Sequence, residues 1–93
     1  MIRVIIERQI ADGLAEHYDR AARDTLQKAM QAHGFISGEA LHNAFDENHR
    51  VVLASYRTVA DWQRWAASSE RKEIMEALTP MLQTDEKITI LEH

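Results

Sequence analysis

The sequence predicts an α+β domain in which one antiparallel sheet carries two helices on one face. Three observations indicate this fold class. Short runs rich in β-branched residues stand near both chain ends and in the middle, longer segments with helical periodicity separate them, and turn residues stand at the boundaries. The chain has 93 residues, so we expect a single domain over residues 1–93. The last three residues, Leu91-Glu92-His93, also match the remnant of a purification tag, and we assign them no chemistry.

The first half of the chain predicts a strand, a helix and a strand. Residues 2–10 carry β-branched side chains on both alternating faces, as in a strand that is covered on both sides. Residues 14–33 repeat apolar or small side chains at three- and four-residue steps, which is typical of an amphipathic helix. Gly34 stands where a left-handed residue ends such a helix. Residues 35–45 predict a second strand, in which Gly38 indicates a bulge.

Two further strands are predicted in the second half. Residues 46–49, Asp-Glu-Asn-His, predict a turn that leads into a strand over residues 50–57. That strand is again apolar on both faces. Residues 87–91 predict a short last strand because they alternate β-branched and polar side chains.

A helical region in two segments separates these strands. Thr58 and Asp61 fit a helix-start pattern, in which the threonine hydroxyl caps early backbone amides. A pause is predicted at Ser68-Ser69, and a second helical segment follows. Pro80 is expected to end it, since proline cannot donate the helical hydrogen bond.

In order, these elements form a βαββαβ chain, which is the ferredoxin-like arrangement. Helices can cover only one face of such a sheet, yet the first and third strands carry apolar residues on both faces. A second copy of the same sheet is the simplest cover for the other face. We therefore expect a homodimer that forms through the sheet face.

Composition excludes several classes of site and partner. The chain has no cysteine, which rules out disulfides and thiolate chemistry. The formal net charge is −4 with acids and bases interleaved, as in the helical pair Asp19 and Arg23, and no basic stripe favours nucleic acid. No apolar run approaches the roughly 20 residues of a membrane-spanning helix. We expect a cytoplasmic protein with no nucleic-acid or membrane partner.

Three segments carry a resemblance to a known family: HGFISGEAL after the first helix, the strand-then-helix run LASYRTVADWQRWAASSE, and the later LTPML. Together with the element order, they resemble the antibiotic biosynthesis monooxygenase (ABM) family, whose members form dimeric α+β barrels. The resemblance covers nearly the whole chain. It implies one of several chemistries: cofactor-free oxidation of quinols or phenols, heme degradation, or isomerisation of small metabolites.

The heme-degrading branch can be compared residue by residue. Its pattern has an asparagine on the first strand, a tryptophan on the second helix and an iron-binding histidine about ten residues later. Trp65 matches the tryptophan, but the asparagine position falls on Glu7 and the histidine position on Met75. A thioether is a weaker iron ligand than imidazole, so the sequence argues against heme degradation.

Cofactor-free oxygenation, as the resemblance implies it, has the substrate supply the electrons. The protein then needs an aromatic-lined cleft that stabilises an oxyanion and excludes water. We expect Trp65 and Tyr56 to position a small aromatic or hydrophobic ligand, and Arg57 or His42 to stabilise its oxyanion or accept its proton. No cofactor and no metal is expected. Further expected substrate contacts are Trp62, Asn43, Arg8 and Met75.

Structural roles remain open alternatives for these residues. Tryptophans at helical spacing beside a sheet, such as Trp62 and Trp65, also suit a packed core. His42 also suits a strand edge, and Arg8 an ion pair. The functional alternatives are a binding module of the same fold without turnover, and an isomerase of a small metabolite.

Overall fold

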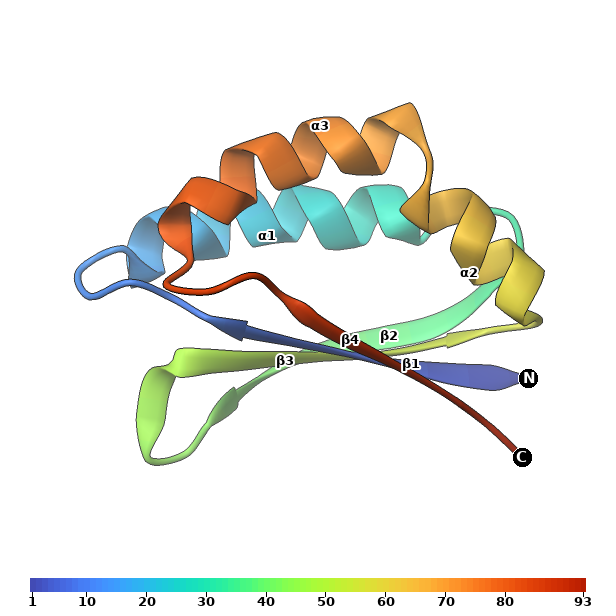
Figure 1. The fold of residues 1–93 in the computed structure, drawn as a ribbon, viewed down its shortest axis with the longest axis horizontal. Coiled ribbons are helices and arrows are strands. Elements are labelled where there is room, and N and C mark those ends of the chain that lie inside the picture. The colour runs from blue at the N-terminus through green and yellow to red at the C-terminus, as the bar shows by residue number, and fades with distance from the viewer.

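A computed structural model describes all 93 residues and confirms the predicted α+β fold class (Figure 1). Figure 1 shows one sheet with all helices on a single side of it. The elements follow in the order β1 (Ile2–Gln9), α1 (Ala15–Ala29), β2 (Phe35–Asn43), β3 (Asp46–Tyr56), α2 (Val59–Ala66), α3 (Ser69–Leu78), a 3₁₀ turn (Thr79–Met81) and β4 (Lys87–Glu92).

The sheet has the strand order β2-β3-β1-β4, with every neighbouring pair antiparallel. In this register Val4 on β1 lies opposite Ala54 on β3 and Ile90 on β4. Residues directly opposite each other share a face of the sheet, so the register fixes which side chains face the helices.

The two faces of the sheet differ in how they are covered. Ile2, Val4 and Ile6 face the helices and are buried, whereas Ile5 and its partner Leu53 face the other way and are only half-buried. The prediction that the central strands are apolar on both faces is therefore confirmed. Within one chain the second face stays uncovered.

The first helix is shorter than predicted. It ends at Ala29 and is capped by Met30, whose backbone amide donates to the carbonyl of Leu26. Gly34 has the expected positive φ of 84°, but it lies in the turn that enters β2. A side chain there would collide with the carboxylate of Asp61, so the absence of a Cβ lets α2 approach this turn.

The hairpin between β2 and β3 turns earlier than predicted. Its turn residues are Ala44 and Phe45, and the predicted turn residues 46–49 belong to β3. The side chain of Asn43 accepts a hydrogen bond from the backbone amide of Phe45 at 2.8 Å. This local bond makes the turn at the asparagine. The side chain of Asp46 accepts a similar bond from Asn48 inside the strand.

The predicted bulge at Gly38 was also wrong. Gly38 pairs regularly with Ala54, and the register shifts occur between Phe35 and Ser37 and between His42 and Asn43. The glycine faces the helices, where a Cβ would press against the ring of Phe35 and the side chain of Leu26. Its role is to leave room for side chains.

The helix boundaries in the second half are confirmed. The Thr58 hydroxyl accepts a hydrogen bond from the Asp61 amide at 3.1 Å and caps α2. The Ser68 hydroxyl accepts one from the Arg71 amide at 3.2 Å and caps α3. Pro80 lies in the 3₁₀ turn that follows α3.

No helix of the structure is long and apolar enough to cross a membrane.

The buried hydrophobic residues form two clusters. The smaller cluster joins the end of β1 to α1 and α3 through Ile10, Tyr18 and Leu78. The larger cluster fills the space between the sheet and α2, and consists of Ile2, Val4, Ile6, Ala29, Ala54, Tyr56, Trp62 and Trp65.

Candidate functional site

A cavity of about 310 Å³ lies between the helix-facing side of the sheet and the helices. A volume of this size suits a small organic ligand. Its lining comes from β1, β2 and β3 below and from α1, α2 and α3 above. On the helix side of the sheet, three lining residues are exposed: Arg23 on α1, and Ala40 and His42 on β2. The cavity therefore opens between α1 and the edge strand β2.

One end of the cavity, called here the aromatic end, is a wall of four rings: Phe35, Tyr56, Trp62 and Trp65. The ring of Tyr56 packs edge-on against Phe35 and Trp62, with a centroid distance of 5.5 Å in both pairs. Both tryptophans are buried core residues and also line the cavity. Both tryptophans therefore belong to the core and to the wall of the cavity at once.

The hydroxyl of Tyr56 is the polar atom of this wall. Burial raises the pKa of Tyr56 to about 12, although the positive charge of Arg71 acts in the opposite direction. No protein hydrogen bond to this hydroxyl is present. At neutral pH the group is therefore protonated and free to donate a hydrogen bond to a bound molecule.

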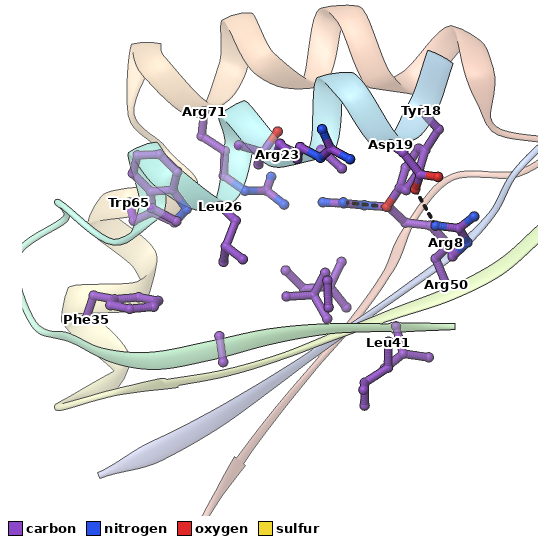
Figure 2. Close-up of a pocket in the computed structure, with 18 of the residues that line it drawn as sticks. Arg8, Tyr18, Asp19, Arg23, Leu26, Phe35, Leu41, Arg50, Trp65 and Arg71 are labelled. Carbon is purple, nitrogen blue, oxygen red and sulfur yellow. Dashed lines mark hydrogen bonds and ion pairs between the residues drawn. The ribbon is translucent and has the colours of Figure 1, made fainter. Parts of the chain in front are cut away.

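The opposite end, called here the arginine end, holds Arg8 and Arg50, which face each other across β1 and β3. Figure 2 shows Phe35 and Trp65 at one end of the cavity and Arg8, Tyr18, Asp19 and Arg50 at the other. The guanidinium of Arg8 donates to the Tyr18 hydroxyl at 3.0 Å. Arg50 forms an ion pair with Asp19 and stacks over the Tyr18 ring, with its Cζ 5.6 Å from the ring centroid.

Glu86, in the loop before β4, connects two arginines behind the cavity. Its carboxylate accepts hydrogen bonds from Arg8 at 3.0 Å and from Arg71 at 2.7 Å. Burial alone would raise the pKa of Glu86, but the hydrogen bonds and charges of Arg71 and Arg8 outweigh it and hold this pKa below its ordinary value. Burial would likewise lower the pKa of Arg8, yet Tyr18 and Glu86 raise it. Arg8 and Glu86 therefore form a charged pair at neutral pH, and the Tyr18 hydroxyl accepts a further hydrogen bond from Arg8.

Arg71 on α3 lies between the two ends. Its guanidinium stacks over the Trp62 ring, with Cζ 5.5 Å from the ring centroid. In Figure 2 it extends into the middle of the cavity. Although the residue is only 8% exposed, a single guanidinium nitrogen, Nη2, has a protein partner, namely Glu86. The other two nitrogens leave donors free for a ligand.

Five of the eight residues predicted as site residues line the cavity: Trp62, Trp65, Tyr56, Arg8 and His42. Four of them are buried in its walls. The fifth, His42, is exposed at the opening, where its Nδ1 lies 3.2 Å from the Asn43 carbonyl oxygen.

The other three predicted site residues lie elsewhere. Arg57 is exposed beyond the end of β3, and its backbone amide donates to the carbonyl of Gly34. Asn43 forms the hairpin turn. Met75 packs behind Arg8, with its sulfur 3.8 Å from Nη2 of that arginine.

The positions of the heme-degrading pattern do not come together in the cavity. Glu7 pairs with Val51 in the sheet and faces away from the helices, and Met75 does not line the cavity. No group of three His, Asp or Glu side chains lies close enough to hold a metal ion. The donor set therefore does not fit heme ligation of that type.

Sequence reasoning missed most of the arginine end. The prediction that Asp19 pairs with Arg23 along the helix was wrong, because Asp19 pairs with Arg50 on β3. The available signal was alternation: Arg50 is two residues before Val52 and therefore faces the same side of the strand. The missed residues at or behind this end are Tyr18, Asp19, Arg50 and Glu86; Arg71 between the two ends and Phe35 at the aromatic end were missed as well.

Solved structures with the same fold are numerous. An antibiotic biosynthesis monooxygenase matches with a TM-score of 0.92 at 14% identity, covering 100% of this chain and 98% of that one. A conserved protein from Methanosarcina mazei Go1 matches with a TM-score of 0.91 at 16% identity, covering 98% and 90%. A mutant of SnoaB, a cofactor-independent oxygenase from Streptomyces nogalater, matches with a TM-score of 0.86 at 14% identity, covering 99% and 92%.

At these identities the structural matches establish the fold alone. No curated protein matches the chain. The family model described as "Antibiotic biosynthesis monooxygenase" matches residues 1–77, which is most of the sequence. The chain therefore belongs to the antibiotic biosynthesis monooxygenase family.

Proposed function

We propose that this protein is a cofactor-independent monooxygenase that acts on a small aromatic quinol- or phenol-like substrate. The observation that carries the proposal is the cavity, which combines a wall of four aromatic rings with an unpartnered tyrosine hydroxyl. A relative of the same fold, SnoaB, is described as a cofactor-independent oxygenase, which adds support.

In such a reaction the substrate itself reduces oxygen. A deprotonated phenol or anthrone gives electrons to O₂, one oxygen atom enters the product and the other leaves as water. For a ring methylene the balance is CH₂ + O₂ → C=O + H₂O. The protein then has three tasks: to hold the ring, to stabilise the negative oxygen of the deprotonated substrate and to keep bulk water away.

The cavity offers a group for each task. Trp65 and Tyr56 would hold the ring, and the protonated Tyr56 hydroxyl would donate a hydrogen bond to the substrate oxyanion. The sequence suggested Arg57 or His42 for the oxyanion; since Arg57 lies outside the cavity, we assign that role to Tyr56. His42 would accept the substrate proton at the opening, where it can pass the proton to solvent.

Oxygen uptake tests the proposal. With a panel of quinols and anthrones, we expect catalysed uptake that falls about 10²–10³-fold in Tyr56→Phe and also falls in Trp65→Phe. Arg57→Gln, which changes an exposed arginine outside the cavity, is the matched control and should keep the wild-type rate.

The same assay separates the alternatives. Uptake no faster than the uncatalysed reaction, and unchanged by Trp65→Phe, would remove the oxygenase proposal. If a substrate is bound but not converted, the protein is a binding module. Conversion without oxygen consumption in an anaerobic chamber would indicate an isomerase.

We also propose that the uncovered face of the sheet pairs with a second copy of the chain. Ile5 and Leu53 lie at its centre, and the exposed Leu41 flanks them. Sedimentation should give a dimer for the wild type and a monomer for Leu53→Arg, because arginine would bury a charge between the sheets. A monodisperse wild-type monomer at micromolar concentration would contradict this pairing.

A further inference from the structure

The cavity carries more positive than negative charge. Its lining contains four arginines, at positions 8, 23, 50 and 71, and a single acidic residue, Asp19. Arg50 is matched by Asp19, whereas Arg8 and Arg71 share one carboxylate, Glu86. A buried positive charge that lacks a full counter-charge is costly in an empty site. The surplus therefore favours a negatively charged ligand.

Arg71 is the arginine best placed to meet that ligand. Arg8 uses all three of its nitrogens on Glu86, Tyr18 and Met75. Arg71 uses only Nη2, and that bond together with the stacking on Trp62 fixes the guanidinium plane. A planar guanidinium with free donors matches the two oxygens of a carboxylate.

We propose that the cavity selects aromatic substrates that carry a carboxylate, with the ring against the aromatic end and the carboxylate bound by Arg71. Arg71 is then the residue that determines specificity, and Glu86 is a positioning residue that holds its guanidinium. This inference deepens the proposed function, since it names the substrate class of the same site, but it concerns binding and needs no turnover.

Calorimetry with two probes of the same shape tests the inference. 2-Naphthoate carries the carboxylate, and 2-naphthamide is its neutral counterpart. We expect the wild type to bind the carboxylate at least about tenfold more tightly, which corresponds to about 1.4 kcal/mol. In Arg71→Gln the preference should fall below threefold, while the affinity for the amide changes little. Arg57→Gln, the exposed control, should keep the full preference.

Two results would overturn the inference. A wild-type preference close to one would show that the arginines do not select an anion. A preference that survives in Arg71→Gln would assign the anion to another group. If Arg71→Gln fails to fold, Arg71→Met keeps the packing on Trp62 without the charge and should lose the preference in the same way.

The binding assay and the oxygen assay test the two proposals separately: the first tests the anion site and the second tests the oxygenase. Calorimetry under nitrogen measures selection of the anion even if no substrate is oxidised. Carboxylate selection without oxygen uptake would retain the anion site and remove the oxygenase. Oxygen uptake that is equal for carboxylate and amide substrates would retain the oxygenase and remove the anion site.

Discussion

The two ends of the cavity are built by different kinds of interaction. The aromatic end consists of neutral rings that pack edge-on, with three of its four members between residues 56 and 65. The arginine end consists of charged side chains that hold one another, and its central bond joins Arg8 to Glu86 across 78 positions of sequence. The aromatic end offers surface for a ring, and Arg71 between the two ends offers a charge with free donors, so a ligand with both features has a single preferred orientation.

The largest loss of stability is expected at the aromatic end. Trp62→Ala should lower the free energy of unfolding by about 3–5 kcal/mol, because the side chain is 3% exposed and supports both Tyr56 and Arg71. Urea unfolding at pH 7 measures this. Phe45→Ala, which removes a 99% exposed ring, is the control and should change stability by less than about 0.5 kcal/mol. Equal effects of the two variants would mean that the aromatic end is not a packed wall.

Loss of the Glu86 carboxylate should lower the free energy of unfolding by less than Trp62→Ala does. Glu86→Gln should cost about 2 kcal/mol at pH 7, because it leaves Arg8 and Arg71 with one neutral partner, while partial exposure of Glu86 softens the loss. Glu73→Gln, an exposed change on the same helix as Arg71, should be nearly neutral. Urea unfolding of the three proteins tests this order.

At low pH, the wild type and Glu86→Gln should have the same free energy of unfolding. The pKa of Glu86 lies below its ordinary value of 4.5 in the folded protein, so its contribution is complete above that value and is lost as the pH falls through the lowered pKa. The two unfolding curves should therefore converge in acid. A constant difference down to pH 2 would contradict the assignment of the stabilising charge to Glu86.

The smallest effect on stability at pH 7 is expected for Tyr56→Phe, since the deleted hydroxyl has no protein partner; we expect less than about 0.5 kcal/mol. At alkaline pH, the ionisation of Tyr56 should become visible in the free energy of unfolding. Burial raises the folded pKa of Tyr56 from 10 to about 12, so the folded state resists ionisation that the unfolded chain accepts. The wild type therefore keeps its full stability below pH 10 and loses stability as the pH rises from 10 toward 12. The wild type should lose stability more steeply than Tyr56→Phe over this range, as followed by unfolding and by tyrosinate absorbance. Identical slopes would place the hydroxyl in solvent.

The two ends also differ in how far the sequence predicts them. A strand followed by a capped helix sets Tyr56, Trp62 and Trp65 on one surface, so local periodicity is enough to group them. The arginine end depends on strand register and on a loop that returns to β1, which local patterns do not contain. Arg71 lies on a mostly exposed helix, and hydrophobic periodicity treats such a residue as solvated.

The fold shows the same division. Element order, the cap at Thr58 and the break at Ser68 follow from local chemistry, and the sequence predicts them correctly. The hairpin turn was misplaced because two Asx side chains, Asn43 and Asp46, both make local backbone bonds and only one makes the turn. Cross-strand pairing decides between them, and it is not visible in a single sequence.

The orientation of a bound aromatic carboxylate shows whether the aromatic end and Arg71 act together on one ligand. A crystal structure with 2-naphthoate should place the naphthalene ring against Phe35 and Trp65, and a carboxylate oxygen within about 3 Å of the Arg71 guanidinium. The reverse orientation, with the ring at the arginine end, would contradict the account. A ligand bound outside the cavity would contradict it as well.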